Sequence, residues 1–135
     1  MASANDATVV RVFTNEPTEN FADLAFAINA DFEVTVEAEA GLALLQGGNQ
    51  FNTNVVVQDI TANNNIAANP ANGFSGQLGQ AAWPNANQSF KYTVPKANLN
   101  GRANHVCQVL AWLTVGNNNQ NVSFVSSPPF ILTNP

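Results

Sequence analysis

The sequence is poor in charge. Only 10 % of its 135 residues are Asp, Glu, Lys or Arg, against roughly 25 % in an average soluble domain. The basic side chains are four, and they stand apart along the chain: Arg11, Lys91, Lys96 and Arg102. Binding to nucleic acid or to an anionic membrane surface requires clustered basic side chains. The sequence therefore argues against nucleic acid as a partner and against docking on a membrane.

Cysteine and histidine are equally scarce, with one residue of each type. Cys107 has no second cysteine with which to form an internal disulfide, and its apolar surroundings in the sequence favour a buried thiol. His105 and Cys107 are fewer ligands than the usual zinc or copper site needs. We expect no metal, no cofactor and no catalytic residue, and we predict that the protein is not an enzyme.

Long hydrophobic runs are also missing. The N-terminus, MASANDATVV, does not have the basic and then apolar pattern of a secretion signal. No segment reaches the roughly 20 apolar residues of a membrane-spanning helix. We expect no membrane insertion, and two locations stay open: a mature secreted or surface protein, or a virion or cytoplasmic protein.

Asparagine takes the place of the missing charge, with 22 residues in the chain. A surface coated with amides stays hydrated but repels a neighbouring molecule weakly, so self-association meets little opposition. The apolar fraction of 45 % is ordinary for a globular protein. The length predicts one domain over residues 8–135, after a flexible N-terminus at residues 1–7.

Alternation of apolar and polar residues is the main local signal. It is clearest in DFEVTVEAEAG (31–41), where one face is apolar and the other carries Glu33, Glu37 and Glu39. Further strands are expected at 8–14, 51–61, 89–95, 105–115 and 121–133, the last interrupted by Pro128 and Pro129. Residues 21–30 fit a helix or a strand, and the strand-like neighbours favour a strand. GLALLQGGNQ (41–50) is interpreted as a turn region.

These segments predict an all-β, antiparallel Greek-key β-sandwich. In order, FEVTVEAEAG, FNTNVVVQDIT, SFKYTVP, HVCQVLAWLTVG and VSFVSSPPFILT resemble strands B, C, E, F and G of immunoglobulin-like or fibronectin-type-III-like domains. The similarity covers about residues 30–133. The inter-sheet disulfide and the tyrosine corner of that family are absent, and a jelly roll or another Greek-key sandwich stays open.

The strand at 105–115 is apolar on both faces. Its odd-numbered residues fit the space between two sheets, which leaves Val106, Leu110 and Trp112 on the outer face. Two covers are possible for them. The long Asn- and Gly-rich excursion at 62–88 can fold back as a lid, or the surface of a second molecule can bind there.

The remaining polar groups suggest two further kinds of site. Trp83, if exposed, offers a stacking surface for a sugar, and amides beside it or in the 116–120 loop can bond the hydroxyl groups; the candidate ligand-binding residues are Trp83, Asn85, Asn87, Asn117, Asn118 and Asn119. Glu33, Glu37 and Glu39 can form the carboxylate pair of a small hydrolase or simply a solvated face. Asp59 with Asn63, Asn64 and Asn65 can supply a weak calcium site.

The predicted function is that of a non-enzymatic structural or interaction protein. It self-associates or decorates a larger assembly, such as a surface layer, a filament or a virion, and its partners are proteins, either copies of itself or other subunits. The alternative is a carbohydrate-binding module or lectin that binds glycans through Trp83 and the Asn-rich loops. Fold analogy does not decide between them, because β-sandwiches host many functions.

Overall fold

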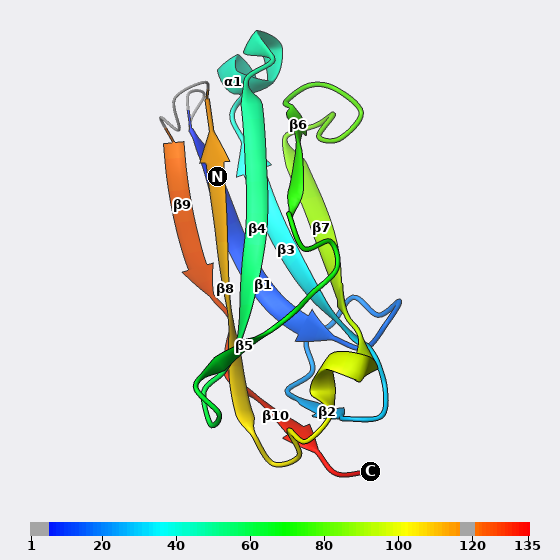
Figure 1. The fold of residues 1–135 in the computed structure, drawn as a ribbon. Coiled ribbons are helices and arrows are strands. Elements are labelled where there is room, and N and C mark those ends of the chain that lie inside the picture. The colour runs from blue at the N-terminus through cyan, green and yellow to red at the C-terminus, as the bar shows by residue number, and fades with distance from the viewer. Residues whose placement is uncertain (1–5, 117–120) are drawn as a thin grey trace.

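The computed structural model describes residues 6–116 and 121–135, and these form two packed β-sheets (Figure 1). The elements in chain order are β1 (Ala7–Asn15), β2 (Ala25–Ala27), β3 (Phe32–Ala40), α1 (Leu42–Gly47), β4 (Gln50–Asp59), β5 (Asn64–Ile66), β6 (Phe74–Gln77), β7 (Asn87–Val94), the 3-10 turn η1 (Lys96–Leu99), β8 (Val106–Val115), β9 (Asn121–Ser126) and β10 (Phe130–Thr133).

The sheets differ in size. Sheet A has the strand order β1-β3-β7. Sheet B has the order β2-β10-β8-β4-β5, and in addition β6 pairs with β4 and β9 pairs with β8. Neighbouring strands are antiparallel, except that β2 runs parallel to β10. The predicted β-sandwich is confirmed, with one parallel pair that the sequence did not indicate.

Strand β3 shows how the alternation produces the two layers. Phe32, Val34 and Val36 are buried between the sheets, while Glu33 and Glu37 are half-buried on the outer side. Thr35 is on the polar side of the pattern but is buried. Its hydroxyl donates to Asn15 Oδ1 at 2.7 Å and accepts from Lys91 Nζ at 3.1 Å, so the buried group is satisfied.

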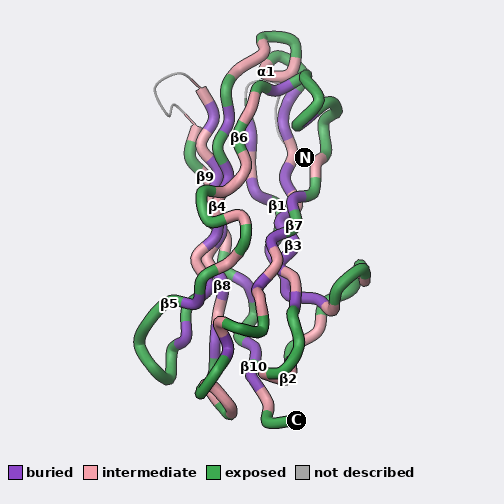
Figure 2. Tube along the Cα trace, turned by 45° about the vertical axis from the view of Figure 1, so that its right-hand side comes forward, coloured by how far each residue is buried: buried purple, intermediate pink, exposed green. Residues whose placement is uncertain are grey.

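Aromatic rings fill both ends of the space between the sheets, where Figure 2 shows the strands as buried. At one end Phe26 stacks on Phe32 with ring centroids 4.6 Å apart, and both rings contact Phe130 edge-on. At the other end Phe51 and Phe90 pack against the indole of Trp83. Such contacts stabilise the core beyond the area that they bury.

Two predicted segments differ in detail from the structure, and a third agrees with it. Residues 41–50 contain the short helix α1 in place of a simple turn; none of its residues is buried, and it ends at Gly48 with φ 63°. Residues 21–30 contain a strand of only three residues, β2. The break at Pro128 and Pro129 is where expected, between β9 and β10.

The excursion at 62–88 is not a lid over β8. Its strands β5 and β6 pair with β4 and therefore widen sheet B at the edge away from β8. Between them the chain reaches sheet A, where Asn69 and Thr93 exchange two backbone hydrogen bonds of 2.7 and 2.8 Å. The segment thus bridges the two sheets along one side of the sandwich, and the outer side of β8 is left uncovered by it.

Candidate interaction surface

The outer side of sheet B carries no charged side chain. Asp59 is the one charged residue in the described strands of this sheet, and its side chain points inward and is buried. The ladder places amide and apolar side chains in rows across β4, β8 and β9. We call the following set the uncharged face: Asn52, Asn54, Val56, Val106, Gln108, Leu110, Trp112, Thr114, Val122, Phe124 and Ser126.

The apolar members of the uncharged face are adjacent. Leu110 is opposite Val56 on one side, and Trp112 is opposite Phe124 on the other. Leu110 and Trp112 are half-buried by their neighbours, whereas Phe124 is 63 % and Val122 is 51 % exposed. Clustered apolar side chains on the surface of a soluble domain usually mark an interaction site.

The outer side of sheet A is different because it is charged. Arg11 forms an ion pair with Glu37 across β1 and β3, and its guanidinium lies 4.1 Å from the centre of the Phe13 ring. Lys91 Nζ is 3.8 Å from the carboxylate of Glu33. The two outer faces of one small molecule therefore have opposite characters, one ionic and one neutral.

The carboxylates of β3 take part in contacts within the chain. Glu33 accepts hydrogen bonds from the Asn15 side chain at 3.1 Å and from the Thr18 amide at 3.2 Å. Glu37 pairs with Arg11, as above, and with Glu39 it lines an open hollow of about 380 Å³ beside Asn87. The solvated-face interpretation accounts for these contacts, and we derive no hydrolytic site from them.

The position of Trp83 contradicts its suggested role as a stacking surface for a sugar, because the side chain is in the core and is 0 % exposed. Its indole meets the rings of Phe51 and Phe90 edge-on, at centroid distances of 5.1 and 5.6 Å. The indole N–H has no acceptor among the described residues. A large aromatic ring in a polar loop gains more by burial than by exposure. The structure thus gives a sugar no stacking surface at this position.

The amides proposed to accompany Trp83 are placed separately from it. Asn85 and Asn87 are exposed, the latter at the start of β7. Asn117, Asn118 and Asn119 lie outside the described residues. No contact in the described part of the chain joins Asn85 or Asn87 into a binding site.

A charged cluster around Asp59 was not anticipated. The carboxylate of Asp59 accepts from the Ala62 amide at 2.9 Å, from Arg102 at 2.7 Å and from His105 Nδ1 at 2.7 Å. Arg102 also donates to Asn64 Oδ1 at 2.6 Å. The cluster joins the end of β4, the turn before β5 and the segment that leads into β8.

The ionisation of Asp59 follows from these partners. Burial alone would raise the pKa of this carboxyl, but the hydrogen bonds from His105, from the Ala62 amide and from Arg102 lower it below its usual 3.8. A charged carboxylate is therefore kept inside the protein by paired donors. Because a guanidinium already neutralises it, the arrangement does not match the calcium site considered from the sequence.

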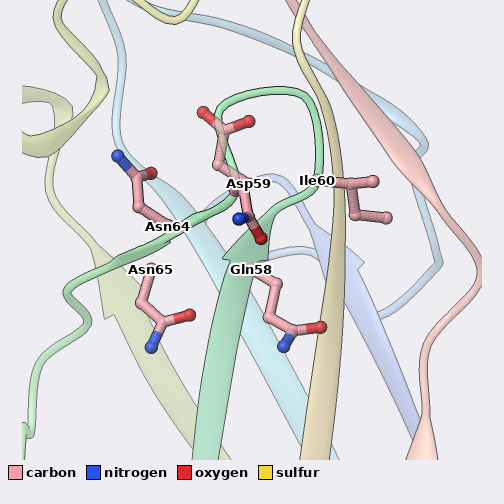
Figure 3. A pocket seen from close by; sticks show the side chains of 6 residues that line it. Gln58, Asp59, Ile60, Asn64 and Asn65 are labelled. Atoms are coloured by element: carbon pink, nitrogen blue, oxygen red, sulfur yellow. The ribbon is translucent and has the colours of Figure 1, made fainter.

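Beside this cluster lies an open hollow of about 250 Å³ (Figure 3). Gln58, Asp59, Asn64 and Asn65 are among its lining residues. The carboxylate of Asp59 is hydrogen-bonded to Ala62, Arg102 and His105. The polar groups that remain to line the hollow are therefore side-chain amides. No His, Cys, Asp or Glu cluster that could hold a metal is present in the part of the chain that the structure describes.

Cys107 lies on the inner face of β8, two residues after His105, and is fully buried. Its thiol lies 4.0 Å from the backbone carbonyl of His105. Burial, together with the nearby charge of Asp59, raises the pKa of Cys107 to about 12. The thiol is therefore protonated at neutral pH and packs as a small apolar group.

Comparison with known proteins gives a likeness of fold. No protein family and no curated protein matches the sequence. Among solved structures, the chain is similar to AggA, the major subunit of aggregative adherence fimbriae type I from Escherichia coli, with a TM-score of 0.50, 9 % identity, and coverage of 98 % of this chain and 99 % of that one. At that identity the comparison shows the β-sandwich alone.

Within the described residues, no helix is long and apolar enough to cross a membrane.

Proposed function

We propose that this chain is a structural subunit without enzymatic activity, and that it associates with copies of itself through the uncharged face. The proposed contact includes Val106, Leu110 and Trp112, with Leu110 and Trp112 at its centre. The observation that carries the proposal is the contrast between the two outer sides of the sandwich: the outer side of sheet A carries ion pairs, and that of sheet B carries none.

Charge explains why a second copy fits this surface. The net charge of the chain is −5, so two copies repel each other wherever their acidic residues meet. The uncharged face is the side on which that repulsion is smallest. In a two-fold arrangement the same patch contacts itself, and a neutral patch satisfies this condition without opposite charges.

Packing supplies the driving force. Removing the half-buried Leu110 and Trp112, together with the exposed Phe124, from water stabilises an interface by about 25 cal/mol for each Å² of apolar surface that is buried. The amides of Asn52, Asn54 and Gln108 surround them and can bond across the contact. An apolar centre within a polar rim is the usual composition of a protein interface.

The likeness to AggA agrees with a subunit role. AggA is described as the major subunit of a fimbria, and it has a sandwich of similar extent. The likeness supplies no interface residue for this chain, so the proposed contact depends on the uncharged face alone.

Sedimentation velocity on two lysine variants tests the proposal. Leu110→Lys places a charge at the centre of the uncharged face, and in a symmetric contact the two new charges meet. We expect association to weaken roughly tenfold or more, which corresponds to about 1.4 kcal/mol. Circular dichroism checks that the variant is folded.

Ser89→Lys is the matched control, because Ser89 is an exposed residue on the outer side of sheet A. It adds the same charge on the opposite face. We expect its association constant to equal that of the wild type. Equal weakening by both variants would show that the position of the added charge does not matter, and would contradict the uncharged face as the contact.

A further inference from the structure

Strand β9 forms an open edge of sheet B. It pairs with β8 on one side, and in Figure 1 no described element lies beyond it on the other. The chain continues along the same side of β8 as β10, but there the edge is covered, because β2 pairs with β10. The described fold therefore leaves space for one more strand beside Asn121–Ser126.

The ladder shows which backbone groups face this space. Ser127 N donates to Val109 O at 2.8 Å, and the register continues through Val125 opposite Ala111. Because backbone groups alternate in direction along a strand, the N–H and C=O groups of Val122, Phe124 and Ser126 point away from β8. The described part of the chain provides these outward groups with no partner.

The inward-facing side chains of β9 fix this strand to β1 and to the core. Ser123 accepts a hydrogen bond from the Val9 amide at 3.0 Å, and its hydroxyl lies 3.2 Å from that of Thr8. Val125 packs against the core. The inner side of β9 is thus fixed on β1, while its outer side and its edge face solvent.

The other edge strands are protected in ways that β9 is not. Natural sheets protect their edges with charged residues, proline or very short strands. In sheet A the edge strands β1 and β7 carry Arg11 and Lys91. In sheet B the strands β2, β5 and β6 are three or four residues long. Strand β9 has six residues, NVSFVS, and no charge or proline among them.

We propose that β9 pairs antiparallel with β9 of a second copy, so that sheet B continues from one molecule into the next. This inference rests on the proposed function, which supplies a self-associating chain, and it adds a second contact to the uncharged face. With the two-fold axis at Phe124, Phe124 is opposite itself and Val122 is opposite Ser126. That register uses all three outward pairs and forms about six backbone hydrogen bonds.

A second copy suits this edge better than a partner of another kind. An acidic or a basic partner finds no opposite charge in β9, whereas an antiparallel copy presents the same neutral sequence and the same outward backbone groups. The exposed side chains of Phe124 from both copies then meet on the uncharged face. Two distinct self-contacts in one chain, a face and an edge, produce an assembly of more than two copies: a closed tetramer if the two-fold axes intersect at right angles, and an open-ended assembly if the axes do not intersect.

Cysteine cross-linking tests the register. In the proposed pairing the two Phe124 Cα atoms are roughly 5.5 Å apart, within the range for a disulfide. The two Val122 Cα atoms are offset by four residues, or about 13 Å, which is beyond that range. We expect Phe124→Cys to form a covalent dimer under mild oxidation on a non-reducing gel, and Val122→Cys to form little or none.

Two controls keep the outcome informative. Wild-type protein should remain monomeric on the gel, because Cys107 is buried and protonated. A mixture of Val122→Cys and Ser126→Cys proteins should cross-link to a mixed dimer, since these residues are opposite each other in the proposed register. Two outcomes would overturn the edge pairing. One is equal cross-linking of Phe124→Cys and Val122→Cys. The other is the absence of cross-linking both in Phe124→Cys and in the mixture.

The edge pairing and the proposed function can fail separately. If wild-type protein associates and Leu110→Lys weakens that association, but Phe124→Cys does not cross-link, the uncharged face stands and the edge contact is wrong. If Phe124→Cys cross-links but Leu110→Lys associates like the wild type, the edge is the sole contact. If the wild type is monomeric at all concentrations and nothing cross-links, both proposals are wrong.

Discussion

Asp59 Oδ2 and His105 Nδ1 lie 2.7 Å apart, and this contact joins the last residue of β4 to the residue before β8. Arg102 donates to the same oxygen at 2.7 Å. The carboxylate is fully buried, whereas its two partners are partly exposed. One ionised group therefore connects three segments at the end of the sandwich opposite to α1 (Figure 1).

Replacing Asp59 with Asn should destabilise the protein by about 3 kcal/mol, because removing one member of a buried ion pair leaves the other uncompensated. Urea unfolding at neutral pH measures this loss. Asp31→Asn is the control: Asp31 is exposed and accepts from the Lys96 amide, a role that an Asn side chain can also fill. Similar losses in both variants would contradict the importance of the cluster.

The carboxylate of Asp59 also makes the stability of the fold decrease at acidic pH. The folded pKa of Asp59 is lower than its unfolded value, so its contribution is complete above about pH 4 and is lost as the pH falls through the folded pKa. We expect the wild type to lose stability more steeply than Asp59→Asn between pH 5 and about pH 2. Urea midpoints across that range measure the two slopes, and parallel slopes would show that Asp59 does not contribute.

Trp83 allows a test of the indole separately from the ring volume. Trp83→Ala leaves a cavity among Phe51 and Phe90 and should cost about 3–5 kcal/mol. Trp83→Phe keeps much of the ring, and the N–H that it removes has no described acceptor. We expect the loss in Trp83→Phe to be less than half of that in Trp83→Ala by urea unfolding. Equal losses would contradict this expectation, because they would show that a phenyl ring restores none of the packing of the indole.

Tyr92 connects the two sheets, since its hydroxyl donates to the backbone carbonyl of Thr53 at 2.8 Å. Burial raises the pKa of Tyr92 to about 12. Tyr92 is the one tyrosine in the chain, so the ultraviolet absorbance of the phenolate reports this group alone. We expect a midpoint near pH 12 in folded protein and near pH 10 in urea. A folded midpoint near pH 10 would contradict the buried position.

The hydroxyl of Tyr92 also predicts a loss of stability at high pH. Between about pH 10 and pH 12 the unfolded chain ionises and the folded protein does not, so stability falls as the pH rises. Tyr92→Phe should lose about 1 kcal/mol at neutral pH with the hydrogen bond. The stability of Tyr92→Phe should then fall less than that of the wild type as the pH rises. Urea midpoints at about pH 9 and pH 11 measure both effects.

Much of the sandwich could be predicted from the sequence because period-two alternation is a local signal. Strand β3 has the expected inward residues, and β8 buries Cys107 and Val109 as its pattern indicates. Proline marked the end of β7 and the break before β10. The helix α1 was missed because it has six residues and no buried face, so its sequence carries no helical periodicity.

The contacts between distant segments could not be predicted in this way. Asp59 meets residues 43 and 46 positions further along the chain, and nothing in the local sequence connects them. Trp83 lies in a polar, proline-containing loop, so the sequence allowed an exposed indole as one possibility. The loop folds inward at that residue, where aromatic packing outweighs the local pattern. The outer side chains of β8 were identified correctly, because period-two alternation within one strand is enough to separate its two faces.

Light scattering on the wild-type protein across a range of concentrations tests the central claim most directly. The account predicts a weight-average mass that rises with concentration above the 14.3 kDa of one chain. A mass that stays at 14.3 kDa at every concentration would contradict self-association through the uncharged face.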